Sequence, residues 1–149
     1  MRILVFVLLA VCTIVGSSRA QEKHVIAAPG APPGLPFSSA VRVGNLLFLS
    51  GQIGVRSGTR ELVPGGIEAQ TRQTMENIKS VLEYAGSSLD RVVKCTIFLA
   101  DMGDYAAMNA VYATFFPQDP PARSAMGASG LAFNAAVEIE CIALARADR

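Results

Sequence analysis

The sequence contains only one histidine, and its three cysteines lie far apart. The histidine, His24, stands near the beginning of the chain, and neither it nor any cysteine has a second Cys or His at metal-ligand spacing. Zinc sites in proteins use three or four ligands of these types, commonly at short spacings. We therefore expect no metal site in this protein.

Basic residues are too few and too scattered to form a nucleic-acid surface. The 13 Lys and Arg residues are balanced by 12 Asp and Glu residues, and no basic run occurs in the chain. A domain that binds the phosphate backbone is expected to carry a basic patch and a high isoelectric point. We therefore expect no nucleic-acid partner. With 51% hydrophobic and 17% charged residues the chain is not a disordered one, and its 149 residues suffice for one domain.

The longest apolar run lies at the start of the chain. Residues 1–20 combine an early arginine, a short hydrophobic stretch and the small-x-small end Ser18-Arg19-Ala20, a pattern that is typical of a signal peptide. The stretch falls short of the roughly 20 apolar residues of a membrane span, and an uncleaved tether is the alternative. We expect cleavage after Ala20. Residues 21–149 would then form a single exported domain, periplasmic or secreted, without stable membrane association and with a formal charge of 11 − 12 = −1.

Cys95 and Cys141 remain after such a cleavage, and both lie inside apolar runs. Outside the cytoplasm two cysteines can form a disulfide. Each of these residues, however, stands where a small buried side chain is wanted, which free cysteine provides. We expect two free thiols in the core, with a disulfide as the alternative.

Hydrophobic periodicity predicts two helices and five strands in the order strand, strand, helix, strand, helix, strand, strand. Proline and glycine fill the segment before the first strand, residues 27–36, which we expect to be irregular. The strands are predicted at residues 40–43, 46–49, 92–100, 123–128 and 136–144, and the helices at residues 67–85 and 105–116.

Each predicted helix has one apolar stripe to bury, so the economical fold is α+β, a mixed sheet with both helices packed on one face. The other face of such a sheet needs a cover. The segment at residues 46–49 is apolar at every position, which indicates burial on both faces and hence a partner subunit.

Arg123 follows a double proline at the start of a predicted strand. Pro120 and Pro121 fix the approaching backbone, so the guanidinium is held on a constrained course. The planar fork of arginine suits a carboxylate or a phosphate. The sequence thus predicts an anion site at Arg123, with an ordinary surface arginine at a strand end as the alternative.

The last predicted strand carries two carboxylates on one face. Because side chains alternate along a strand, Glu138 and Glu140 point the same way and lie roughly 7 Å apart. If the strand of Arg123 pairs with this strand, Arg123 becomes the natural partner of these acids and an arginine–carboxylate pocket follows. A solvated edge strand that uses acids to stay soluble is the alternative.

Seven short segments, in order along residues 35–140, together resemble the reactive intermediate deaminase family, also called the Rid or YjgF-like family. The segments are Leu35-Pro36-Phe37-Ser38, Ser50-Gly51-Gln52, Gln70-Thr71 with Asn77, Val93-Lys94-Cys95-Thr96, Asn109-Ala110-Val111-Tyr112, Pro121-Ala122-Arg123-Ser124 and Val137-Glu138-Ile139-Glu140. The resemblance implies a chorismate-mutase-like fold of the bacillus type. It also implies a homotrimer with clefts at its subunit interfaces.

Deaminating members of that family hydrolyse enamines and imines derived from amino acids, such as 2-aminoacrylate, 2-iminopropanoate and 2-iminobutanoate, to the 2-oxo acid and ammonia. The resemblance implies no cofactor. It assigns substrate binding to Arg123 and the positioning of the attacking water to Glu138, and it makes Asn109 and the Ser50-Gly51 backbone further substrate contacts. A carboxylate-bearing imine needs such a cation, and a carboxylate suits the activation of water.

Two positions depart from the family pattern. Phe37, a further expected substrate contact, keeps the ring of a frequent tyrosine without its hydroxyl, and Ala125 stands where many deaminases have cysteine. An exported, non-catalytic binding module for small carboxylates, using the same arginine, is the alternative function. The ribonuclease activity attributed to some relatives is disfavoured, because the chain has neither a basic surface nor a histidine pair.

Overall fold

The computed structural model of the protein describes residues 22–29 and 34–146. The predicted signal peptide, residues 1–20, lies outside the described residues, and so does part of the proline-rich lead-in, residues 30–33. Within the described ranges, no helix is both long and apolar enough to cross a membrane.

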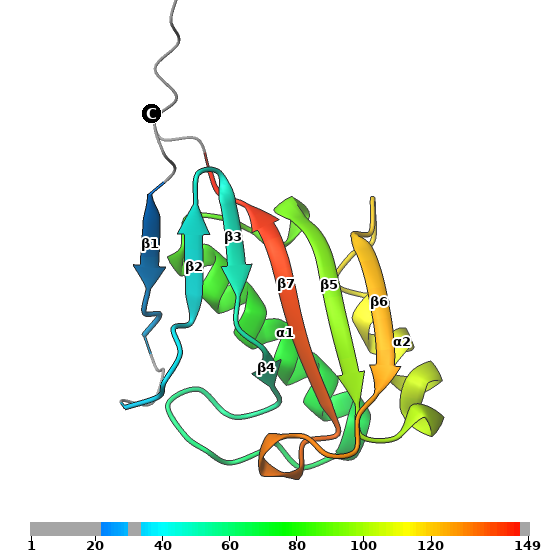
Figure 1. Cartoon of the computed structure of the whole chain (residues 1–149). Coiled ribbons are helices and arrows are strands. Elements are labelled where there is room, and N and C mark those ends of the chain that lie inside the picture. Colours follow the sequence, from blue (N-terminus) through cyan, green and yellow to red (C-terminus); the bar gives the residue numbers. More distant parts are fainter. Residues whose placement is uncertain (1–21, 30–33, 147–149) are drawn as a thin grey trace, which may run out of the picture.

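The strands form one mixed sheet (Figure 1). Its order is β1-β2-β3-β7-β5-β6, and the short β4 lies in line with β3 along β7. The printed pairings are antiparallel except for β5 with β6, which run parallel. The bounds are β1 Lys23–Ile26, β2 Ala40–Val43, β3 Leu46–Leu49, β4 Gln52–Ile53, β5 Val92–Leu99, β6 Ala122–Gly127 and β7 Val137–Leu144.

Both helices cover the same face of the sheet, as predicted for an α+β fold (Figure 1). Helix α1 (Gly66–Tyr84) buries one stripe of side chains, whose members are Thr71, Thr74, Met75, Ile78, Val81 and Leu82. Gly86 follows it with a φ of 75°, the left-handed conformation that ends many helices. Helix α2 (Tyr105–Ala113) is shorter than predicted, because the amides of residues 114–116 bond three residues back ahead of Pro117. The described part of the chain also contains three short 3₁₀ helices, at Leu89–Arg91, Met102–Asp104 and Ala132–Asn134.

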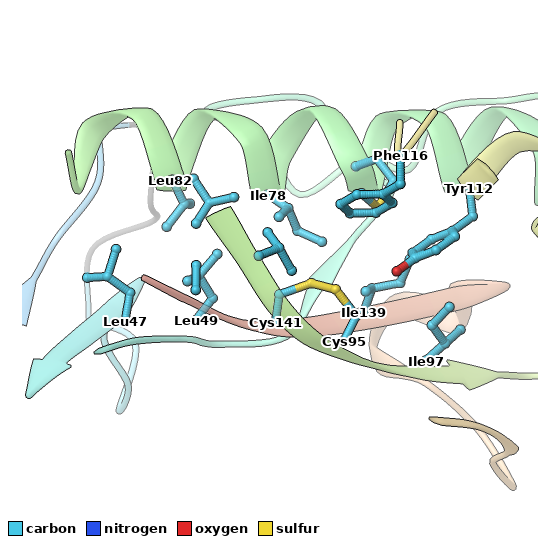
Figure 2. Close-up of a cluster of buried hydrophobic side chains, with 14 of the residues drawn as sticks. Leu47, Leu49, Ile78, Leu82, Cys95, Ile97, Tyr112, Phe116, Ile139 and Cys141 are labelled. Carbon is cyan, nitrogen blue, oxygen red and sulfur yellow. A yellow bond between two sulfur atoms is a disulfide. The ribbon is translucent and has the colours of Figure 1, made fainter. Parts of the chain in front are cut away.

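The core lies between α1 and the sheet, and a disulfide runs through it (Figure 2). Cys95 on β5 stands directly opposite Cys141 on β7, with their Cα atoms 4.2 Å apart, and the two sulfurs are bonded. Both residues are at most 2% exposed. The prediction of free thiols is therefore wrong. Burial was predicted correctly, but the cross-strand register that joins the two side chains could not be inferred from either segment alone.

Among residues 22–29 and 34–146, no helix of the same copy covers the second face of the sheet (Figure 1). Along β7 the core positions alternate with Glu138, Glu140, Ile142 and Leu144, which point to this open face as predicted. Phe48 of β3 lies opposite Ile142 there and is 42% exposed. Residues 46–49 are therefore buried on one face only within a single copy.

Candidate active site

Helix α2 holds the guanidinium of Arg123. On β6, Arg123 faces the helices, because its neighbours Ala122 and Ser124 are exposed on the open face. Its Nη1 donates a hydrogen bond to Asn109 Oδ1 at 2.7 Å, and its Nη2 donates one to Tyr105 Oη at 2.9 Å. Arginine has five N–H donors. Three of them have no partner among the described residues, so the guanidinium keeps donors for an anion, as the prediction of an anion site requires.

Two tyrosine rings lie beside the same guanidinium. The Cζ atom of Arg123 is 4.9 Å from the ring centre of Tyr112 and 5.7 Å from that of Tyr105. These are cation–π distances. Burial raises the pKa of Tyr112 to about 12, although the charge of Arg123 lowers it. Tyr112 therefore stays neutral at physiological pH and supports Arg123 with its ring.

The spacing of these side chains follows from the helix. Tyr105, Asn109 and Tyr112 are separated by four and three residues, so they lie on one stripe of α2. The family resemblance singled out Asn109 as a substrate contact, and Tyr112 stood in the same quoted segment, but Tyr105 was missed. The same helical spacing, applied from Asn109 backwards, would have found it.

Glu138 forms a second cluster, on the open face of the sheet. Its carboxylate fills the space beside Gly51, where a Cβ atom would collide with Oε1 of Glu138. Burial, and in second place the charge of Glu140, raise the pKa of Glu138 above its ordinary value of 4.5. A carboxylate with a raised pKa is a stronger base, which suits the activation of water.

The loop before β4 ties the lead-in to this cluster. Ser50 Oγ donates to the carbonyl of Ser38 at 2.6 Å, and the Ser50 amide donates to the carbonyl of Ser39 at 3.1 Å. These bonds fix the segment that carries Phe37, whose ring is 58% exposed. Gly51 thus belongs to the cluster of Glu138, with Ser50 as its neighbour in the chain, whereas no contact among the described residues places Phe37 against Glu138.

Two amide side chains of α1 brace the backbone on either side of Glu138. Gln70 Oε1 accepts from the amide of Ala136 at 2.8 Å. Asn77 Nδ2 donates to the carbonyls of Ile53 and Val55, at 3.0 and 2.9 Å. Because Ile53 is the pairing partner of Glu138, these bonds fix both strands that carry the cluster.

Arg123 and Glu138 do not meet within one chain. Strand β6 pairs with β5 rather than with β7, so β5 lies between them. Arg123 stands opposite Cys95, and Cys95 opposite Cys141, three residues along β7 from Glu138. Two strand spacings and three residues separate the two Cα atoms by roughly 14 Å, and the side chains point to opposite faces. Among the described residues they form no ion pair. The expected pocket between adjacent strands is therefore wrong for a single chain.

The candidate residues thus fall into two halves. The anion-binding half contains Arg123 and Asn109, and the acid half contains Glu138, Gly51 and Ser50. Phe37 lies on the exposed lead-in and, within the described part of the chain, contacts neither half. Over residues 22–29 and 34–146, no three His, Cys, Asp or Glu side chains gather where they could hold a metal ion.

Comparison with known proteins gives consistent matches. The family model described as Endoribonuclease L-PSP matches residues 27–145. A RutC family protein of Pyrococcus horikoshii is 48% identical over 122 residues, which cover 81% of this chain and 97% of that protein. A protein of Dermatophagoides farinae named 2-iminobutanoate/2-iminopropanoate deaminase is 43% identical over 123 residues, covering 82% of this chain and 96% of its own.

Solved structures have the same fold. The crystal structure of the yeast protein YEO7 superimposes with a TM-score of 0.80 at 43% identity, covering 84% of this chain and all of that chain. The E. coli protein TdcF, solved with bound serine, superimposes with a TM-score of 0.74 at 35% identity, covering 83% and 99% of the two chains. The chain belongs to the YjgF-like family of reactive intermediate deaminases, also called the RutC family.

Proposed function

We propose that this protein hydrolyses small 2-imino acids of the 2-iminopropanoate and 2-iminobutanoate type to 2-oxo acids and ammonia. The observation that carries the proposal is that the two halves of the site supply complementary groups. One half has an arginine with unpaired N–H donors, and the other has a carboxylate with a raised pKa. The relative from Dermatophagoides farinae that bears the deaminase name supports it. So does the amino acid bound to TdcF, because serine carries the carboxylate that Arg123 would bind.

The working site would lie between two copies of the chain. Arg123 and Glu138 of one copy are too far apart for one small substrate, so a second copy has to supply the missing half. The open sheet face, with Phe48, Met126 and Ile142, offers apolar surface for such an interface. A closed ring of three copies, which the family resemblance implies, would form three such sites.

The reaction needs no group beyond these side chains and water. Arg123 binds the substrate carboxylate, and the ionised Glu138 of the neighbouring copy accepts a proton from a water molecule. The oxygen of that water forms a bond with the imine carbon, and the proton passes from Glu138 to the nitrogen. Glu138 then takes the proton of the new hydroxyl group and passes it to the nitrogen, the carbon–nitrogen bond breaks, ammonia leaves, and the carbon becomes the 2-oxo carbonyl. Enamines such as 2-aminoacrylate enter after tautomerising to the imine.

Export would place this reaction outside the cytoplasm. The predicted cleavage after Ala20 leaves the described domain intact, because the family match begins at residue 27. The disulfide between Cys95 and Cys141 supports this location, since such bonds persist in oxidising compartments.

An assay of imine decay tests the proposed activity. An amino acid oxidase generates 2-iminopropanoate in the presence of residues 21–149, and imine decay is followed over time. We expect the protein to accelerate decay and Arg123→Ala to abolish the acceleration, whereas Arg56→Ala, which removes an exposed arginine paired with Glu61, leaves it unchanged. No acceleration by the unmodified protein, together with thermal stabilisation by 2-oxo acids, would instead establish the non-catalytic carboxylate-binding module.

A further inference from the structure

Tyr105 lies beside Arg123 in the anion-binding half of the site, and it does not pack in the hydrophobic core. Its ring is 37% exposed, and it is not a member of the buried cluster beneath the sheet. Its one hydrogen bond among the described residues is the one that Oη accepts from Arg123 Nη2 at 2.9 Å. Packing therefore does not explain why the side chain lies there.

The direction of that hydrogen bond leaves the phenol proton unused. A tyrosine hydroxyl has one O–H donor besides its acceptor lone pairs. Because the guanidinium donates to the oxygen, the O–H of Tyr105 has to point to some other acceptor. An acceptor that also lies beside a guanidinium with unpaired donors is most favourable when it is an anion.

The neighbouring tyrosine cannot fill this role. Tyr112 lies beside the same guanidinium, but it is 4% exposed, and its hydroxyl has no partner among the described residues. Its hydroxyl is enclosed in the core, as Figure 2 shows. Of the two tyrosines in contact with Arg123, Tyr105 is therefore the one whose hydroxyl a ligand can reach.

We propose that Tyr105 is a carboxylate-binding residue, whose O–H donates to a carboxylate oxygen of the ligand while Arg123 donates to the same group. This inference rests on the proposed function for its ligand class, small 2-imino and 2-oxo acids. With donors from both Tyr105 and Arg123, the carboxylate is the most tightly held part of the ligand. The site is therefore selective against neutral analogues of the same size.

Calorimetry with 2-oxobutanoate tests the contact directly. We expect Tyr105→Phe, which keeps the ring and removes the hydroxyl, to bind 2-oxobutanoate roughly tenfold more weakly, the effect of one hydrogen bond to a charged group. In the imine assay the same variant should raise KM with little change in kcat, because the carboxylate is held equally in the ground and transition states. Tyr84→Phe is the matched control, since it removes the hydroxyl of another exposed tyrosine, at the end of α1.

A second variant separates direct contact from mere positioning of Arg123. In an Arg123→Lys background, direct contact predicts that Tyr105→Phe still weakens binding several-fold, whereas a purely positioning role predicts no further loss. Thermal melts of all variants confirm folding.

Equal affinity of Tyr105→Phe and the unmodified protein, or no further loss in the lysine background, would overturn the inference. If the unmodified protein still hydrolyses imine, only the role of Tyr105 is wrong and the proposed function is retained. If the unmodified protein neither binds 2-oxobutanoate nor hydrolyses imine, both proposals are wrong.

Discussion

At Glu138, the missing side chain of Gly51 determines where the carboxylate lies. Sequence reasoning named both residues, but it assigned Gly51 to substrate contact through its backbone. The structure adds that Gly51 leaves room for the Glu138 carboxylate itself.

The partners of Arg123 could be predicted only in part, because contacts between a helix and a strand depend on packing rather than on local pattern.

Gly51→Ala should therefore impair activity more than folding. The added Cβ collides with Oε1 of Glu138, the end of a flexible side chain that can turn away. We expect imine hydrolysis to fall by roughly 10²-fold or more, as for loss of a catalytic base, with little change in Tm. Assay and thermal melt of the same preparation check this.

Gly54→Ala provides the contrast, since its Cβ would lie 2.7 Å from the Cα atom of Gln70, which cannot turn away. This variant should lose stability. Full activity of Gly51→Ala would contradict the placement of Glu138.

The raised pKa of Glu138 predicts opposite effects on stability and on activity. A folded-state pKa above the ordinary 4.5 means that the folded protein binds this proton more tightly than the unfolded chain does. The stability that protonated Glu138 contributes to the folded protein is therefore lost as the pH rises from about 4.5 through the raised pKa. Glu138→Gln should match or exceed the unmodified protein in Tm at pH 7, while imine hydrolysis is lost.

A pH profile gives the second measurement. Acceleration over the uncatalysed decay should fall as the pH drops through the raised pKa, because the base becomes protonated. A Glu138→Gln variant that is active, or clearly less stable at pH 7, would show that the carboxylate has a structural role instead.

At the scale of elements, local pattern predicted most of the sheet and both helices. The hairpin of β2 and β3 lies at the predicted residues because a Gly-Asn turn joins two apolar runs. β1 and β4 were missed. β1 is a largely exposed edge strand with lysine and histidine, and β4 has only two residues, so neither shows a hydrophobic period. The position of β5 between β6 and β7 is a long-range pairing, which no local pattern encodes.

The disulfide between β5 and β7 should contribute substantially to stability. It closes a loop across a sequence separation of 46 residues, and such a bond typically stabilises a small domain by about 2–4 kcal/mol. We expect reductant to lower the urea midpoint of residues 21–149. Cys95 and Cys141 should also resist alkylation in denaturant until reductant is added. Full alkylation without reductant would restore the original expectation of free thiols.

For the whole molecule, we propose an active site that is composed of residues from two copies of the chain. The sequence indicated an uncovered sheet face and hence a partner subunit, and the structure leaves that face open in one copy. What the sequence could not indicate is that Arg123 and Glu138 point to opposite faces of the sheet. That separation follows from strand order. Under the proposed function, a second copy would take part in the chemistry and not only in the packing.

Complementation between two inactive variants tests whether Arg123 and Glu138 act together across two copies. Arg123→Ala and Glu138→Gln are each assayed alone for imine hydrolysis, then co-expressed with different tags so that mixed assemblies can be isolated. In a cyclic trimer every mixed assembly has one site of three with both native residues, so the isolated mixed assemblies should show about a third of the unmodified activity. A site shared between two copies predicts this recovery from two inactive parents. Mixed assemblies that remain inactive would contradict it, because they would show that Arg123 and Glu138 do not act together across two copies.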